Sequence, residues 1–159
     1  MEVIKINVSF WTYLGEHPDF IGILEDSDGD KSWCLNGKFH REDGPAVEFA
    51  NGDKSWWLNG KCHREDGPAV EWANGSKAWH LNGKFHREDG PAIERADGSK
   101  YWWLNGKLHR EDGPAVEYAN GDKAWCLNGK YFSEQDWKLK MRKKLRKKKL
   151  GLILSECQS

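Results

Sequence analysis

Several features that commonly reveal a protein's class are missing from this sequence. Its four cysteines, Cys34, Cys62, Cys126 and Cys157, form no CxxC pair and have no regular spacing, which favours a reducing compartment over a disulfide framework. No apolar run reaches the roughly 18 residues that a membrane-spanning helix needs, and the opening MEVIKINVSFW lacks the apolar stretch of a secretory signal. We therefore expect a soluble, intracellular protein.

Long aliphatic residues are also scarce, whereas the 159 residues include ten tryptophans. A chain of this length is expected to form one domain, and here aromatic surface must replace much of the usual aliphatic core. The net charge is zero, but the charges are unevenly distributed. Residues 1–136 carry 16 basic and 24 acidic side chains (net −8), and residues 137–159 carry 9 and 1 (net +8). The sequence thus predicts an acidic body with a basic tail.

The sequence repeats itself every 23 residues. One unit reads K-x-W-x-L-N-G-K-x-H-R-E-D-G-P-A-V-E-x-A-N-G-x, and its tryptophan recurs at Trp33, Trp56, Trp79, Trp102 and Trp125. The same offset places Phe10 on the Trp position, His17 on the His position and Glu25 on the Glu position, which suggests a degenerate first copy. We divide the chain into a capping repeat (1–29), tandem repeats (30–132) and a basic amphipathic helix with its tail (133–159).

Each unit contains two short strand segments, K-x-W-x-L and A-V-E-x-A, joined by Asn-Gly turns. The expected fold is all-β: an elongated, twisted, single-layer antiparallel sheet of tandem hairpins. A two-residue turn at Asn51-Gly52 would pair Val47 with Trp56 and Ala46 with Trp57. One face would then hold Trp56, Val47, Leu58 and Phe49, and the other Glu48, Ala46, Ala50, Ser55 and Trp57.

The unit W-x-N-G-K-x-H-x-x-x-G-x-x-x-x-x-x-N-G-x resembles the MORN repeat. The HREDGPA form is similar to a variant found in phage and large-virus proteins, although HREDG replaces the usual HGxG. The resemblance covers roughly residues 10–130. It implies an elongated sheet that serves as a scaffold or binding surface, with lipid binding and dimerisation among the roles attributed to such arrays.

Five histidines share one repeat position: His17, His40, His63, His86 and His109. A metal or acid/base site would require them to converge, whereas equivalent positions of an extended array are displaced from copy to copy. We expect an architectural role, with the HRED arginine pairing to an acid of the adjacent loop and the histidine bonding backbone. The sequence contains no P-loop, metal cluster or placed nucleophile, so we expect no enzyme, no cofactor and no catalytic or metal-binding residue.

Positions that differ among copies are better candidates for function than positions that every copy fills alike. Three columns vary: 34, 57, 80, 103 and 126; 32, 55, 78, 101 and 124; and 49, 72, 95 and 118. Their large members are residue types enriched at interface hot spots, although the rings could instead thicken a thin core. The predicted partner-binding residues are Trp57, Trp72, His80, Arg95, Tyr101, Trp103 and Tyr118. Trp57, Tyr101 and Trp103 are expected to share a face with His80 and with the glutamates at one repeat position, which we call the Glu48 stripe: Glu48, Glu71, Glu94 and Glu117.

A C-terminal helix should start at Ser133, whose hydroxyl can cap it, and Trp137, Met141 and Leu145 would close the last repeat up to about residue 145. The basic run exceeds what a cap requires. It comprises Lys140, Arg142, Lys143, Lys144, Arg146, Lys147, Lys148 and Lys149. Nucleic-acid phosphates, an anionic membrane, a nuclear-targeting receptor and an acidic protein surface, its own or a neighbour's, are alternative targets.

Together these patterns predict a non-enzymatic protein-binding scaffold, a viral adaptor or inhibitor of a host defence protein that uses the variable aromatic positions. The alternative is a peripheral module that binds anionic membrane or nucleic acid through its tail. The expected partner is a host protein, with a homodimer as a further option. The expected location is the host cytoplasm, or the nucleus if the host is eukaryotic.

Overall fold

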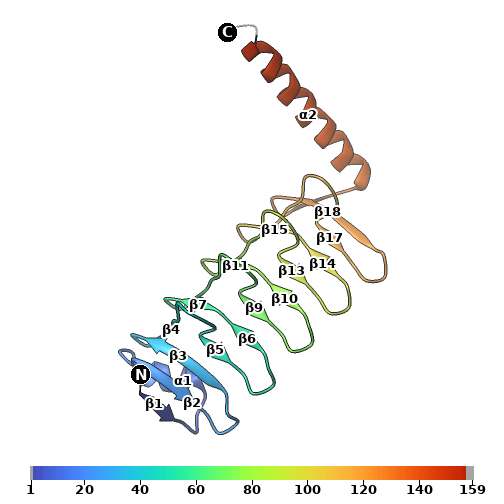
Figure 1. The fold of residues 1–159 in the computed structure, drawn as a ribbon. Helices are drawn as coiled ribbons and strands as arrows, with labels where there is room; N and C mark the ends of the chain where they lie inside the picture. Colours follow the sequence, from blue (N-terminus) through green and yellow to red (C-terminus); the bar gives the residue numbers. More distant parts are fainter. Residues whose placement is uncertain (1, 157–159) are drawn as a thin grey trace.

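The computed structural model describes residues 2–156, with side chains described for residues 2–150. It is an elongated array of β-hairpins from whose last repeat helix α2 (Glu134–Glu156) projects (Figure 1). The main sheet has 13 strands and remains open. The predicted fold, an open all-β hairpin repeat with a C-terminal helix, is therefore confirmed.

The strands form a long sheet and a row of hairpins. The long sheet is a meander of β2 (Gly22–Glu25), β3 (Lys31–Leu35), β5 (Val47–Glu48), β6 (Lys54–Ser55), β9 (Val70–Glu71), β10 (Lys77–Ala78), β13 (Ile93–Glu94), β14 (Lys100–Tyr101), β17 (Val116–Glu117) and β18 (Lys123–Leu127). The hairpin row consists of β7 (Trp57–Leu58) with β8 (Lys61–Cys62), β11 (His80–Leu81) with β12 (Lys84–Phe85), and β15 (Trp103–Leu104) with β16 (Lys107–Leu108). At the ends of the row, β3 pairs with β4 (Lys38–Phe39) and β18 with β19 (Lys130–Phe132).

The recurring tryptophan is the residue at which each repeat passes from the long sheet into its hairpin. The Trp56 N–H donates to the Ala69 carbonyl in the long sheet at 2.8 Å, while its own carbonyl accepts from the His63 N–H in the hairpin at 2.9 Å. Successive hairpins are joined by further backbone bonds, such as that from the Gly60 N–H to the Phe39 carbonyl. Both parts of every repeat are therefore hydrogen-bonded to the neighbouring repeats.

The two Asn-Gly turns of a repeat have different geometries. At Asn59-Gly60 both residues have positive φ, and Leu58 pairs with Lys61, which is the predicted two-residue turn. At Asn51-Gly52 the two-residue prediction is wrong. The Phe49 N–H donates to the Asp53 carbonyl, the Gly52 N–H donates to the Phe49 carbonyl, and Gly52 alone has positive φ, at 94°. The loop therefore has three residues, the geometry of a type I turn followed by a glycine bulge.

This extra loop residue shifts the register by one position and corrects the predicted faces. Val47 pairs with Ser55, not with Trp56, and Glu48 pairs with Lys54. Because side chains alternate along a strand, Trp57 and Ser55 lie on the side of Val47, opposite the glutamates. We call these the variable face, which holds Val47, Phe49, Ser55, Trp57 and their equivalents, and the outer face, which holds Glu48, Lys54, Trp56, Leu58 and theirs.

The outer face carries an alternating ladder of lysine and glutamate across the long sheet. Cross-strand partners follow one another in the order Glu25, Lys31, Glu48, Lys54, Glu71, Lys77, Glu94, Lys100, Glu117 and Lys123. Opposite charges that face each other across antiparallel strands contribute about 0.2–1 kcal/mol per pair. Among the described ladder partners only Lys31 and Glu25 come within ion-pair distance, at 4.0 Å, whereas the glutamates of the four full repeats pair with the HRED arginines.

The HRED arginine of each repeat stabilises its own repeat on the outer face. The Arg64 guanidinium carbon lies 4.2 Å from the Trp56 ring centre, and its side chain bonds Asp66 at 2.9 Å and Glu71 at 3.3 Å. The other three repeats have the same arrangement around Arg41, Arg87 and Arg110. The arginines were expected to pair with the adjacent loop, and this detail is corrected because the nearest acids belong to the same repeat.

The N-terminal cap departs from the hairpin pattern. Residues aligned with the first strand form helix α1 (Phe10–Glu16), which Ser9 caps by accepting from the Thr12 N–H, and which buries Phe10 and Leu14. Strand β1 (Val3–Lys5) pairs with β2 in parallel. From β2 onward the degenerate copy follows the repeat: Glu25 pairs with Lys31, and Gly29 has φ 86° in the same three-residue turn.

The C-terminal helix packs on the last repeat through its first turns. Ser133 caps it, as predicted, by accepting from the Asp136 N–H at 3.1 Å. The Trp137 ring lies 4.6 Å from the Trp125 ring, and its indole N–H donates to the Arg110 carbonyl. Leu145, expected to close the repeat, is 66% exposed, because the helix has already left the array at that point (Figure 1).

Candidate partner-binding face

The register brings all three variable columns onto one face of the array. The Trp57 indole N–H donates to the Ser55 hydroxyl at 2.7 Å, which joins the first column to the second. The Tyr101 ring centre lies 6.0 Å from that of Tyr118 and 5.2 Å from the Arg95 guanidinium carbon. These two contacts join the second column to the third. The Glu48 stripe, expected beside these residues, lies on the opposite face. The seven predicted partner-binding residues thus line one surface.

These seven residues differ in how much of their surface is accessible. Trp72 is 38% exposed and Tyr118 is 44% exposed, as is Phe49 at 42%, and Arg95 is exposed as well. Trp57, His80, Tyr101 and Trp103 are half-buried. The third column, at the turns of the long sheet, therefore presents the most accessible rings, whereas the first column also fills space between strands.

A fourth variable column, which was not predicted from the sequence, supports the half-buried rings. It reads Phe39, Cys62, Phe85, Leu108 and Tyr131. Phe39 lies 5.6 Å from the Trp57 ring, and Phe85 lies 4.1 Å from His80 and 5.5 Å from Trp103. Comparing the repeats at this position would have revealed the column, because it varies as the other three do.

Two buried side-chain nitrogens on this face have no hydrogen-bond partner among the described residues: His80 Nδ1 and Trp103 Nε1. Trp57 finds a hydroxyl at Ser55, but the corresponding positions beside His80 and Trp103 are Ala78 and Tyr101. Loss of hydration lowers the pKa of His80 below its ordinary value, which favours the neutral imidazole. The centre of the face therefore leaves hydrogen-bonding capacity unused.

A pocket of about 330 Å³ lies where the variable face meets the N-terminal cap. Phe10 and Trp11 of α1 form one side, and Phe39, Phe49 and Trp57 belong to the repeats. The remaining lining residues are Ser9, Asp26, Asp30, Val47 and Ser55. Trp11, at 68% exposed, was not predicted, because it lies on a helix that alignment with the repeat did not anticipate.

The histidine column bridges successive repeats. The Asn59 N–H donates to His40 Nδ1 at 3.1 Å, and His40 Nε2 lies 3.7 Å from Glu42. The same bridge joins His63 to Asn82, His86 to Asn105 and His109 to Asn128. His17 lies outside this column, since it stacks on Tyr13 in the cap. Among the side chains described for residues 2–150, no cluster of three or more His, Cys, Asp or Glu could hold a metal ion.

Three further pockets, of about 470, 530 and 550 Å³, repeat between successive HRED loops on the outer face. Each is lined by arginine, acidic, tryptophan, leucine and histidine side chains that the array already pairs with one another.

The three cysteines that the structure describes are unsuited to nucleophilic chemistry. Cys34, Cys62 and Cys126 are buried, and burial raises their pKa, for Cys62 to about 12, so these thiols stay protonated.

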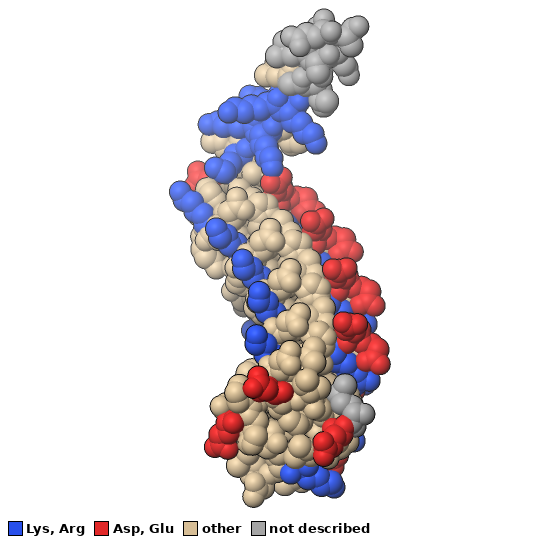
Figure 2. Space-filling model, turned by 90° about the vertical axis from the view of Figure 1, so that its left-hand side faces the viewer, with Lys and Arg blue, Asp and Glu red and all other residues tan. Residues whose placement is uncertain are grey.

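All eight residues of the predicted basic tail lie on α2 and are exposed. Lys144 forms an ion pair with Glu111, and Lys138 pairs with Glu134. The basic side chains gather on the projecting helix, beyond the separate acidic and basic columns of the array (Figure 2). None of the described helices is both long and apolar enough to cross a membrane.

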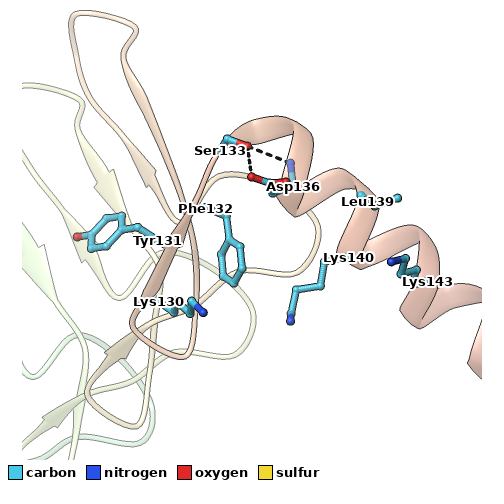
Figure 3. Close-up of a pocket in the computed structure, with 8 residues that line it drawn as sticks. All are labelled: Lys130, Tyr131, Phe132, Ser133, Asp136, Leu139, Lys140 and Lys143. Carbon is cyan, nitrogen blue, oxygen red and sulfur yellow. Dashed lines mark hydrogen bonds between the residues drawn. The ribbon is translucent and has the colours of Figure 1, made fainter.

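An open pocket of about 670 Å³ lies at the junction of β19 and α2 (Figure 3). Phe132 lies between the repeats and the helix, with the Lys130 ammonium 5.8 Å and the Lys140 ammonium 5.4 Å from its ring centre. Lys143 also lines this pocket, whereas Asp136 is bonded to Ser133. The junction therefore continues the basic surface of the helix onto the last repeat.

Neither a family model nor a curated protein matches this sequence. The resemblance to MORN repeats therefore stays a prediction that depends on the repeat motif alone.

Proposed function

We propose that the chain is a non-enzymatic scaffold that binds a partner protein through the variable face. The proposal rests on a difference between the two faces. Four nearly identical Arg–Trp–Asp–Glu groups lie on the outer face, whereas the columns that differ between copies lie on the variable face. Residues repeated in every copy support the array, whereas differing residues are free to recognise something asymmetric. Exposed aromatic and arginine side chains are the types that anchor protein interfaces.

The role of a viral adaptor, or of an inhibitor that occupies a host defence protein, is the specific form that we propose, and this part depends on the repeat resemblance alone. The host cytoplasm is the location that this role implies.

A capture experiment with face-specific variants tests the proposal. Trp72→Ser combined with Tyr118→Ser removes two exposed rings, and Lys77→Ser combined with Lys123→Ser alters the outer face at positions that are also exposed. The first pair is preferable to Trp57 and Trp103, which are half-buried against Phe39 and Phe85. A host protein captured by the wild type should be lost with the aromatic pair and kept with the lysine pair. Equal capture by both variants would contradict the proposal.

A second candidate function is binding of polyanions by α2, either anionic lipid or nucleic acid. The favouring observation is that seven of the nine basic residues in 137–150 form no ion pair with any described carboxylate. Such binding should weaken steeply between low and moderate salt and should disappear when residues 142–149 are replaced by serine and alanine. Capture by the variable face should survive both treatments.

A further inference from the structure

The pocket between α1 and the first repeats combines five aromatic rings with two carboxylates. Its buried floor consists of Phe10, 8% exposed, and Phe39, 4% exposed, with ring centres 6.3 Å apart. Trp11 stands edge-on to Phe39 at 4.8 Å, and Trp57 lies 5.6 Å from Phe39 on another side. Phe49 completes the ring-lined wall. Phe39 meets Phe10, Trp11 and Trp57 in edge-type contacts, with interplanar angles of 83°, 69° and 68°, and these rings give the pocket an aromatic lining.

The two carboxylates come from the first turn of the long sheet, and backbone groups hold them in place. Asp26 Oδ1 accepts from the N–H groups of Asp28 and Asp30, at 3.0 and 3.1 Å. Asp30 Oδ1 accepts from the Ala50 N–H at 2.8 Å. In the part of the chain that the structure describes, Oδ2 of each has no hydrogen bond and neither carboxylate has an ion pair. The negative charge beside the rings is therefore uncompensated locally.

No lysine or arginine lines this pocket, in contrast to the four other pockets described above. On the outer face every HRED arginine lies over a tryptophan and pairs with carboxylates of its own repeat. The pocket offers the same two kinds of group, rings and carboxylates, without the cation. An apolar ligand would leave the carboxylates unpaired, and an anion would be repelled by them.

We propose that this pocket binds the side chain of a lysine from the partner protein, with its alkyl chain against the phenyl rings and its ammonium beside Trp11, Asp26 and Asp30. The lysine stem suits the apolar floor, and its charged end suits both the ring faces and the carboxylates. The pocket shares Val47, Phe49, Ser55 and Trp57 with the variable face, so the inserted lysine anchors one end of the bound partner. This step rests on the proposed function of that face.

Titration with n-butylammonium, the lysine side chain as a free ion, tests the pocket directly at constant ionic strength. The readout is the NMR signals of the indole N–H groups of Trp11 and Trp57, assigned with single Trp→Phe variants. We expect saturable shifts of these two signals, with those of Trp72 unchanged. The uncharged analogue 1-pentanol has a similar apolar chain and should bind at least about fivefold more weakly, because it lacks the charge.

Variants separate the contributions of charge and ring. Asp30→Asn keeps an oxygen for the Ala50 N–H but removes the charge, and should weaken butylammonium binding about three- to tenfold. Trp11→Ala removes a 68% exposed ring and should abolish the Trp57 shift without unfolding the protein. Trp72→Ala, outside the pocket, is the matched control and should bind as the wild type does.

Equal binding of 1-pentanol and butylammonium, or an unchanged affinity in Asp30→Asn, would overturn the proposal. Its failure and that of the proposed function can be told apart. If butylammonium does not bind but capture still depends on Trp72 and Tyr118, the face stands and the lysine pocket is wrong. If butylammonium binds as expected but capture ignores those residues, the pocket stands and the proposed interface is wrong.

Discussion

The outer face and the variable face are formed by the same strands, yet they differ in how much they change from repeat to repeat. On the outer face, the arginine-to-tryptophan distance is 4.1, 4.2, 4.0 and 3.8 Å in four successive repeats. On the variable face, the position of Trp57 is filled in turn by cysteine, tryptophan, histidine, tryptophan and cysteine. This difference supports our proposal that the outer face stabilises the array and the variable face recognises a partner.

The largest expected effect contrasts two arginines of one repeat. Arg87→Ala on the outer face loses the Trp79 ring at 4.0 Å, Asp89 at 2.9 Å and Glu94 at 3.0 Å, together with a bond to the Pro91 carbonyl. We expect the free energy of unfolding to fall by about 2–3 kcal/mol. Arg95→Ala on the variable face should change it by less than about 0.5 kcal/mol. Urea unfolding measures both, and equal losses would contradict the division between the faces.

The next prediction concerns the three-residue turn that sets the register of the two faces. Gly98 has φ 92°, and a Cβ added there would meet no atom within 4 Å, so Gly98→Ala tests backbone conformation alone. We expect it to destabilise the protein by about 1–2 kcal/mol. Gly15 has equally open space but lies in α1 without positive φ, so Gly15→Ala should stabilise by about 0.5–1 kcal/mol. Thermal or urea unfolding that shows the same sign for both would refute this turn geometry.

A pH titration sharpens the description of the outer face. The Arg87 side chain, through its hydrogen bond and its charge, lowers the pKa of Asp89 below the ordinary value. The unfolded pKa is the higher of the two, so this contribution to stability is complete above about pH 4 and is lost as pH falls through the folded pKa. Carboxyl NMR should show the Asp89 pKa returning to its ordinary value in Arg87→Ala. An unchanged Asp89 pKa in that variant would rule out the arginine as the cause.

The smallest expected effect lies at the centre of the variable face. His80→Phe removes the unpaired Nδ1 and keeps a ring against Phe85. We expect a free energy of unfolding that is unchanged or raised by up to about 1 kcal/mol, because an unsatisfied buried polar group is removed. A clear loss of stability in urea unfolding would mean that the imidazole has a structural bonding partner.

The sequence predicted the repeat, its strands and the Ser133 cap because these depend on local patterns. It could not distinguish the two Asn-Gly turns, since the same dipeptide serves a two-residue turn at Asn59 and the end of a three-residue loop at Gly52. Because the loop is one residue longer than predicted, Trp57 and Tyr101 lie on the face opposite the glutamates, whereas the prediction placed them on the same face. The error was therefore one of register: Trp57 and Ser55 share a face as predicted, but that face also holds Phe49 and lies opposite Glu48.

The N-terminal pocket was missed for a different reason. Alignment with the repeat placed Phe10 on a strand, whereas Ser9 caps a helix on which Phe10 and Leu14 lie four residues apart and are both buried. The capping serine and this spacing were visible in the sequence. The proximity of Trp11 to Phe39 and Phe49 was not, because it depends on how α1 packs against the first repeats.

Disulfide formation in a Cys157→Ser background tests the face assignment most directly. Glu48 and Lys54 are cross-strand partners, so cysteines at these two positions should form a disulfide readily. Cysteines at Glu48 and Ser55 would be opposite each other only if the loop had two residues. Rapid cross-linking of the first pair and slow cross-linking of the second is the predicted result. Faster cross-linking of the second pair would mean that Trp57 and Tyr101 lie on the same face as the glutamates, which would contradict the assignment of the two faces.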